Sequence, residues 1–503
     1  MIPTLRALLQ VADLPAFAGP TVAGVAVLYG AGVAAISLWA ARRTRTAADF
    51  FVAGRGIGLL ALTLATLASN ISGFAFIGGP GLVYARGLGA VWIILPAGIT
   101  GALGAWVLAK RLRLLAEVRP MLTIPDALGA RYGSRLVQGL AGVAILVAIV
   151  GYMAANLRAL GVVTDAVFGI GLGPAIWLGT LVMIAYSASG GSLSGVYVDV
   201  LQGTIMAAAS TLVFAYVLDA GGGMAGLSRT ILAADPAFLD PWGHLPPLTA
   251  ASFFFVFGLG VLGQPHVLHK FYMLKDPLRL KWFPLLGTAA LVLTVLLFVG
   301  VGVAVKALVV TGELEPLANP DFATPLFLLR RTPLLLAAIV LSGVLAAIMS
   351  TVNAFLSVGA GAITHDIPVA LGRPLGDELR WARWATVLIA AAAAAAAQLP
   401  GALVSFLGIF GWGLFASTLV PALAIGLNWA GGTRAGAVAS IATGLVATLA
   451  LETAGFLGWI ALPAGVSVAG LTLVLSLLVY LGVSAATSAS ARLDPDVRAV
   501  LES

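Results

Sequence analysis

The stretch LASNISGFAFIGGPG, residues 67–81, contains four glycines and one proline inside a long run without charged side chains. This run lies between Arg55 and Arg86, and as one straight helix it would measure about 45 Å against roughly 30 Å of membrane hydrocarbon. Glycine and proline weaken a helix, and backbone groups freed inside a bilayer persist only where they line a cavity or bind a ligand. The stretch therefore predicts a membrane helix that is interrupted at a binding site.

The composition is typical of a polytopic membrane protein. The chain has 503 residues, of which 60% are hydrophobic and 9% charged, and apolar runs recur along its whole length. A soluble protein of this size could not solvate such a surface. The absence of cysteine excludes disulfides and thiolate metal sites. We expect the lipid bilayer as a partner and no nucleic acid, because the net charge of +7 follows the membrane topology.

Thirteen candidate membrane helices can be placed on the apolar runs. They lie near residues 18–40, 58–84, 88–109, 136–164, 173–189, 194–218, 249–269, 283–309, 333–364, 382–398, 401–428, 435–456 and 459–484. The expected fold is an all-α polytopic membrane protein, with residues 1–503 forming a single transmembrane domain.

The positive charges indicate how these helices are oriented. Of the 27 Lys and Arg residues, 20 fall in the segments after the odd-numbered spans or in the C-terminal tail, and Lys270 is one of these 20. Cytoplasmic loops are rich in Lys and Arg, so we expect a multi-pass protein of the cell (inner or plasma) membrane with its C-terminus in the cytoplasm. The odd number of spans then places the N-terminus outside. The pair Arg330–Arg331 is an exception to the pattern.

A second interrupted helix is expected five spans later, in FGLGVLGQPHVLHK, residues 257–270. Broken helices at corresponding places in two halves indicate inverted repeats with a binding site at their interface. The repeats would be residues 58–218 and 249–428, followed by two extra helices in 435–484. The alternative is that the glycines only permit close helix packing.

The ninth span, with GVLAAIMSTVNAF at residues 343–355, supplies two adjacent hydroxyls, Ser350 and Thr351. A small hard cation binds neutral or anionic oxygens, and these hydroxyls together with carbonyls of an unwound helix would provide them. The alternative is that both hydroxyls bond the carbonyls of their own turn. Asn70 and Asp199 are further polar candidates, although Asp199 lies near the cytoplasmic end of its span, where water would reach it.

Five segments together resemble the sodium:solute symporter family: DFFVAGRGIG at 49–58, the opening stretch with its FIGGPG ending, SASGGSLSGVYVDVLQG at 187–203, GQPH at 263–266 and LSGVLAAIMSTVNAF at 341–355. The resemblance covers nearly the whole chain. It implies a LeuT-type fold with a five-plus-five inverted repeat, one extra helix before the core and two after it. It also implies alternating access driven by sodium, with sodium as a co-transported ligand and no resident cofactor.

The resemblance also implies the positions of the two ligands. A sodium ion would be held by the carbonyls of Ala68, Ile71 and Ala347 and by the hydroxyls of Ser350 and Thr351. The solute would be bound by residues of the fourth helix and of the two interruptions, namely Ser72, Gly73, Phe74, Ala75, Tyr152, Asn156, Phe257, Val261 and Gln264. Phe74 and Phe257 would form apolar walls, or alternatively pack only against lipid or protein.

Departures from the family pattern bear on the solute. Proline-type members have an acidic residue at the position of Asn70 and an aromatic one at Val261, whereas sugar-type members have a polar residue at Ala75. The FIGGPG ending is most similar to the pantothenate and monocarboxylate branches. A monocarboxylate or an amino-acid-like solute is therefore favoured over a sugar.

The other polar groups of the spans allow several interpretations. Arg158 would meet a solute carboxylate or, as we favour, reach the surface or pair with Asp165. His266 and His269 suggest a gating or surface role rather than a metal site, because no further ligands cluster with them.

The expected function is sodium-coupled import of a small organic solute by alternating access. A membrane sensor that signals to a separate partner and a proton-coupled symporter of the same fold remain alternatives. The residues do not indicate an enzyme, because they show no nucleophile with a base and no metal-ligating cluster.

Overall fold

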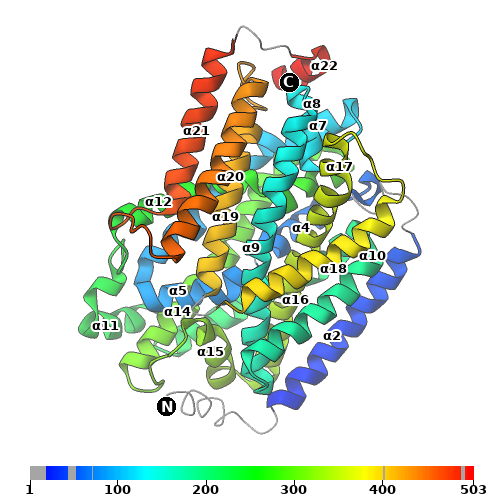
Figure 1. The fold of residues 1–503 in the computed structure, drawn as a ribbon. Coiled ribbons are helices and arrows are strands. Elements are labelled where there is room, and N and C mark those ends of the chain that lie inside the picture. Colours follow the sequence, from blue (N-terminus) through cyan, green and yellow to red (C-terminus); the bar gives the residue numbers. More distant parts are fainter. Residues whose placement is uncertain (1–17, 44–51, 71, 400–402, 489–492) are drawn as a thin grey trace.

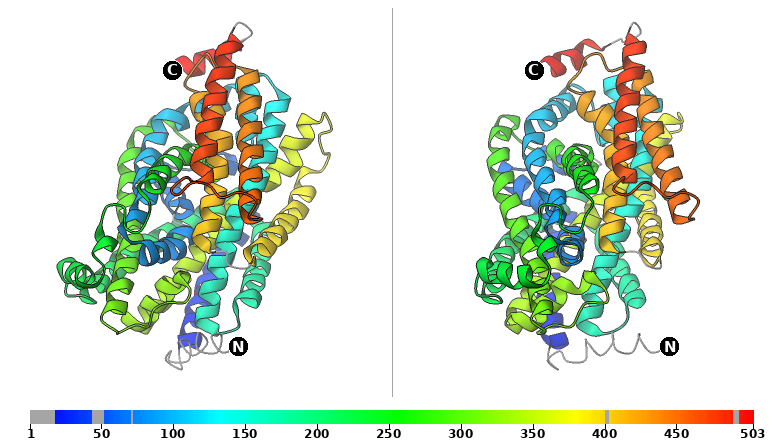
Figure 2. Two further views of the ribbon diagram at one scale, coloured as in Figure 1. Left: turned by 60° about the vertical axis from the view of Figure 1, so that its left-hand side comes forward. Right: turned by 90° about the vertical axis from the view of Figure 1, so that its left-hand side faces the viewer.

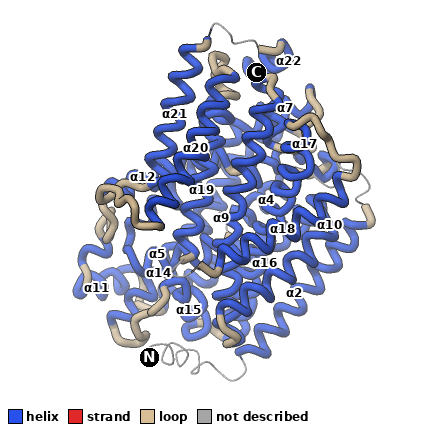
Figure 3. The backbone as a smooth tube through the Cα atoms, viewed as in Figure 1, coloured by secondary structure: helices blue, strands red, loops and turns tan. Residues whose placement is uncertain are grey.

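The computed structural model describes residues 18–43, 52–70, 72–399, 403–488 and 493–503. Within these ranges the chain is helical and contains no β-strand, apart from an isolated bridge between Ile57 and Leu274. Figure 3 shows helices joined by short loops throughout. The expectation of an all-α membrane fold is confirmed.

The first half of the chain begins with an outer helix and then brings the expected broken helix into the core (Figure 1). Its elements are α2 (Ala18–Ala41), α4 (Leu59–Asn70), the π-helical η2 (Phe74–Gly78), α5 (Gly79–Arg86), α6 (Val91–Gly104), η4 (Ala105–Ala109), α7 (Lys110–Val118), α8 (Ile124–Tyr132), α9 (Arg135–Phe168) and α10 (Leu172–Asp219).

The second half contains the other expected broken helix and ends with α20, α21 and the short α22. Its elements are α11 (Met224–Ala234), α12 (Pro247–Gly260), η6 (Val261–Gly263), α13 (Pro265–Leu268), η7 (His269–Met273), α14 (Phe283–Val310), η9 (Pro320–Phe322), α15 (Ala323–Arg331), α16 (Leu334–Gly361), η10 (Ala362–Asp366), α17 (Ile367–Ala370), α18 (Glu378–Ala397), α19 (Val404–Val420), η11 (Pro421–Ile425), α20 (Arg434–Phe456), α21 (Val468–Ala486) and α22 (Pro495–Glu502).

Nine helices of the described residues are long and apolar enough to cross a membrane, or ten if the bent pair Pro247–Gly263 and Pro265–Met273 is one span. Shorter apolar helices cover Leu59–Ser69 and Leu172–Ala185. The expected spans 173–189 and 194–218 both lie in the 48-residue helix α10. The count of thirteen spans therefore stays a prediction.

Helix α9 forms the centre of the molecule, where it packs along α19. Small residues allow the two backbones to approach closely, as is common between membrane helices. A Cβ added at Gly411 of α19 would lie 2.5 Å from Cβ of Tyr152, and one at Gly151 would lie 2.5 Å from the ring of Phe410. Helices α20 and α21 pack together beside α19, at the edge of the bundle (Figure 2).

Candidate functional site

The first predicted interruption is present, but it lies earlier than the glycines. Helix α4 ends at Asn70, Ser72 is outside any helix, and the chain then continues through η2 into α5. The glycines after η2 are helical and serve close packing: a Cβ at Gly79 would lie 2.0 Å from Phe298, and one at Gly81 would lie 2.7 Å from the carbonyl oxygen of Pro320. The packing interpretation therefore holds for this part of the stretch.

The second predicted interruption is also present. Helix α12 ends at Gly260, a 3-10 turn follows, and Gln264 is extended with φ −78° and ψ 101°. The two halves of the helix are bent by 41° at this point. Pro265 begins α13, where its missing N–H costs no hydrogen bond.

An aromatic cavity of about 100 Å³ lies beside both interruptions. The rings of Phe74 and Phe257 stack with centroids 6.0 Å apart, and Phe257 stacks on Trp412 at 5.2 Å. Tyr152 meets Trp412 edge-on at 6.1 Å. Five of the nine predicted solute residues line this cavity: Phe74, Ala75, Tyr152, Phe257 and Val261.

The other four predicted solute residues are buried behind the cavity wall and hold it in place. The hydroxyl of Ser72 lies 3.3 Å from that of Tyr152, and Asn156 accepts a hydrogen bond of 3.0 Å from the backbone N–H of Gly73. Asn156 also donates to the carbonyl of Tyr152 at 3.0 Å. The amide of Gln264 donates to the carbonyl of Gly260 at 3.2 Å.

Trp412 of α19 is a cavity residue that our sequence analysis missed. Its indole N–H is buried and makes no hydrogen bond with the described residues. A buried indole N–H usually has a partner, so this group is available to an acceptor on a bound solute. The signal in the sequence is a tryptophan between two glycines in an apolar helix, FGWGLF at residues 410–415.

The helices expected to hold the ion do meet. The hydroxyl of Thr351 donates to its own-turn carbonyl, Ala347, at 3.0 Å and lies 3.3 Å from the carbonyl oxygen of Ser69 at the end of α4. Ala68, Ala347, Ser350 and Thr351 are all fully buried. Ile71 and the side chain of Asn70 lie outside what the structure describes. Ser69, one residue after the predicted ligand Ala68, supplies the α4 carbonyl that Thr351 contacts.

Ser350 and Asp199 form a second polar group next to this contact. The hydroxyl of Ser350 donates to one carboxylate oxygen of Asp199, and the other oxygen lies 2.6 Å from Nζ of Lys270. The expectation that water reaches Asp199 is wrong, because this residue is only 3% exposed. The assignment of Lys270 to a loop is also wrong, because its side chain is buried within the bundle.

The remaining polar candidates are engaged within the protein. Arg158 donates to the carbonyl of Ala397 at 2.8 Å, while Asp165 accepts from the backbone of Gly171, so the suggested Arg158–Asp165 pair is absent. His269 contacts the carbonyl of Leu122 at 2.8 Å. His266 is likewise buried, and packs against Phe355 with ring centroids 4.1 Å apart. Both histidines are thus core residues rather than surface residues.

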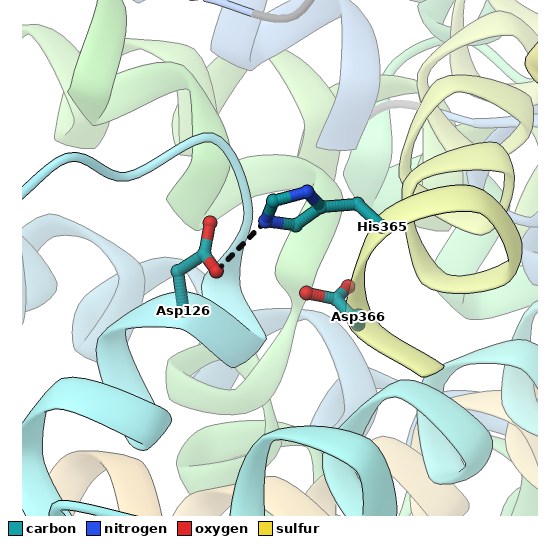
Figure 4. A group of neighbouring side chains, drawn as sticks. All are labelled: Asp126, His365 and Asp366. Atoms are coloured by element: carbon teal, nitrogen blue, oxygen red, sulfur yellow. Dashed lines mark hydrogen bonds and ion pairs between the residues drawn. The ribbon is translucent and has the colours of Figure 1, made fainter. Parts of the chain in front are cut away.

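A further cluster connects α8 to η10, the segment that follows α16. Within the described residues, Asp126, His365 and Asp366 place their ligand atoms within 4.8 Å of one another (Figure 4). His365 Nε2 lies 3.0 Å from Asp126, and Thr123, the N-cap of α8, donates to Asp366 at 2.7 Å. Asp126 also accepts from two backbone amides of its own turn. These bonds fix the loop helix α8 against the membrane bundle.

Comparisons with known proteins agree with this geometry. The family described as "Sodium:solute symporter family" matches residues 50–444. The sodium/pantothenate symporter of Escherichia coli K12 is 29% identical over 455 residues, which cover 87% of this chain and 92% of the relative. The sodium/proline symporter of Haemophilus influenzae is 31% identical over 443 residues, which cover 84% and 86%.

A solved structure shows the same fold. A Na⁺-coupled sialic acid symporter in a substrate-bound outward-open state superposes with a TM-score of 0.74 at 18% identity, covering 94% of this chain and 98% of that one. The expected LeuT-type fold is therefore confirmed. From the extent of the family match and from these relatives, the chain belongs to the sodium:solute symporter family.

Proposed function

We propose that this protein imports a small organic solute together with sodium, and that the solute binds in the aromatic cavity. As a sodium:solute symporter it is a transporter and not an enzyme, and sodium is its co-transported ligand. The observation that carries the assignment of the site is the cavity itself. It lies where both interrupted helices contribute a wall, Phe74 from the first and Phe257 from the second.

The lining of the cavity favours a solute with an apolar body and few polar groups. None of the described lining residues is charged, and Ala75 offers no hydrogen bond to a sugar hydroxyl. The indole N–H of Trp412 has no partner among the described residues, and Tyr152, which also lines the cavity, carries a hydroxyl 3.3 Å from that of the buried Ser72. We infer that a monocarboxylate or an amino-acid-like molecule is bound through these groups, as Arg158 is already engaged by Ala397. Two of the relatives are named for pantothenate and proline.

For the ion we propose the place where α4 meets α16. There the hydroxyl of Thr351 lies 3.3 Å from the carbonyl oxygen of Ser69 and 3.0 Å from that of Ala347. The carbonyl of Ala68 and the hydroxyl of Ser350 are also expected as ligands. Ile71 is expected to add a carbonyl. Such a set of neutral oxygens suits a hard monovalent cation. Binding there would hold α4 against α16 and so connect the ion to the first interruption.

We also propose that the end carrying α7, α8, α17 and α22 faces the cytoplasm. These elements gather at one end of the molecule, and α11 and α15 lie toward the other (Figure 1). The first group brings positive charge to the C-terminal helix: Arg119 pairs with Asp494 at 2.7 Å, and Lys110 donates to Ser503 at 2.6 Å. An excess of Lys and Arg marks the cytoplasmic side of a membrane protein.

The function is tested by uptake into proteoliposomes. A thermal-shift screen of small carboxylates and amino acids, with and without sodium, first identifies the solute. We then expect the labelled solute to accumulate above its outside concentration with sodium outside, and uptake to stop when choline replaces sodium at fixed pH. Sodium-independent uptake would contradict sodium coupling. Binding without accumulation would favour the alternative of a solute sensor, and uptake driven by a pH gradient in choline would favour proton coupling.

A further inference from the structure

Lys270 is a buried lysine whose ammonium group is fully satisfied by three oxygens. It follows α13, in the inner half of the second interrupted helix, and only 3% of it is exposed. Its Nζ lies 2.6 Å from Asp199 Oδ2, 2.6 Å from the carbonyl oxygen of Ala65 and 2.5 Å from the hydroxyl of Ser69. An ammonium group has three hydrogens to donate, so each finds one acceptor.

These oxygens resemble the ligands of a bound cation. A carboxylate, a hydroxyl and a backbone carbonyl are the oxygen donors that a hard cation prefers, and the ammonium carries the same single charge as sodium. Ser350 donates to the second oxygen of Asp199, so this carboxylate is fixed on both sides. Helices α4, α10 and α16 therefore all meet at the ammonium of Lys270 or at its counter-ion.

The ammonium is also next to the proposed ion site. Ser69 belongs to both groups, because its hydroxyl contacts Lys270 while its carbonyl contacts Thr351. A cavity of about 20 Å³, large enough for one water-sized occupant, is lined by Asp199, Lys270 and Ser350. A cation would fit between the carboxylate and the hydroxyl if the lysine were not there.

We propose that Lys270 acts as a tethered cation that fills a cation position at Asp199, and that it thereby sets how many ions move with each solute. This inference rests on the proposed sodium symport. With the ammonium in place Asp199 needs no ion from solution, and the cycle uses only the ions bound elsewhere. Without the ammonium the carboxylate would be buried and unpaired, which is strongly unfavourable, and it would recruit a cation from solution.

The test compares Lys270→Met with the wild type, both as full chains in proteoliposomes. Measuring the membrane potential at which net solute flux reverses gives the charge moved per solute. We expect one more positive charge per solute in Lys270→Met, a steeper sodium dependence, and about fortyfold higher solute accumulation at 100 mV with equal sodium on both sides. Lys270→Arg should keep the wild-type charge, because it keeps the cation. The exposed Lys275→Met is the matched control and should also keep it.

A double variant covers the case in which Lys270→Met is inactive. Lys270→Met with Asp199→Asn removes both charges, so it should transport with the wild-type charge per solute and no added cation. Unchanged charge movement in an active Lys270→Met overturns the proposal, and so does a double variant as inactive as the single one. Uptake by the wild type that does not depend on sodium would instead overturn the proposed function. Failure of this inference and failure of the proposed function are therefore distinguishable.

Discussion

Asp321 lies in η9, between α14 and α15, and connects this segment to the start of α19. It is 1% exposed, and its carboxylate accepts a hydrogen bond of 3.0 Å from the backbone N–H of Val404. Burial raises the pKa of Asp321 from 3.8 to about 6, although the hydrogen bond from Val404 and the positive charge of Arg158 each lower it. Thr324, three residues later, donates to the carbonyl of Phe76 in η2 at 2.6 Å. The Asp321 loop thus lies directly over the first interruption.

The raised pKa means that the folded protein binds a proton at Asp321 more readily than the unfolded chain does. The contribution of the neutral carboxyl to stability is therefore fully present below pH about 4, and it is lost as the pH rises through about 6. A difference of about two pKa units corresponds to about 3 kcal/mol at pH 7.5. For a chain of this length, with an unfolding entropy of about 1 kcal/mol/K, that equals about 3 °C in the unfolding temperature.

We expect Asp321→Asn to remove this pH dependence, because its amide oxygen can still accept from Val404 without carrying charge. The variant should unfold about 3 °C higher than the wild type at pH 7.5 and at the same temperature at pH 4. Thermal unfolding of the purified protein in detergent, scanned from pH 4 to 8 at one heating rate, measures this. The exposed Asp240→Asn is the matched control. A difference between Asp321→Asn and wild type that does not change with pH would refute the reasoning.

Three further substitutions test the site. Thr351→Ala should raise the sodium concentration for half-maximal uptake roughly tenfold or more, since a hydrogen-bonding group to a charge contributes about 1.5–3 kcal/mol. Thr364→Ala, which removes another buried hydroxyl of the same span, should leave it unchanged. Trp412→Phe keeps the ring but loses the free N–H, so solute binding in a titration should weaken roughly tenfold or more; equal affinity would exclude the indole as a ligand. Gly411→Ala should lower the unfolding temperature, because its new methyl group would overlap Tyr152 and overpacking costs about 1–3 kcal/mol. Gly455→Ala should leave the unfolding temperature unchanged, because there is open space around Gly455.

The sequence was sufficient to predict the fold and both interruptions, because glycine, proline and uncharged length are local signals. Within the predicted stretch 67–81, however, the later glycines do not mark the interruption, which lies at Ser72. The reason is that Gly79 and Gly81 are required by contacts with Phe298 and Pro320, more than 200 residues away in the chain. A glycine needed for close packing and a glycine needed for unwinding look the same in a sequence.

Two residues of the proposed sites, Lys270 and Trp412, were missed for the same physical reason. Lys270 follows an apolar run and precedes other charged residues, so its position in the sequence suggests a loop. Its burial depends on Asp199, whose carboxylate comes from a different helix. Trp412 lines the cavity because α19 packs on α9 and faces Phe257, and neither contact leaves a periodic signal in the local sequence. Phe74 and Phe257 were found because they belong to the interruptions themselves.

The arrangement gives a physical reason for coupling between ion and solute. Ser69 contacts Thr351 at the proposed ion site, and Phe74, five residues further along the chain, forms a wall of the aromatic cavity. An ion that holds the end of α4 against α16 therefore also restricts the segment that carries Phe74. The first ligand to bind pays the conformational entropy of ordering this segment. The second ligand then loses less entropy and binds more tightly. Thermodynamic linkage requires the effect to be mutual: sodium must raise the affinity for solute by the same factor by which solute raises the affinity for sodium. Thr351→Ala should bring this shared factor closer to one, and an unchanged factor in that variant would show that the two ligands are not linked through Thr351 and α4.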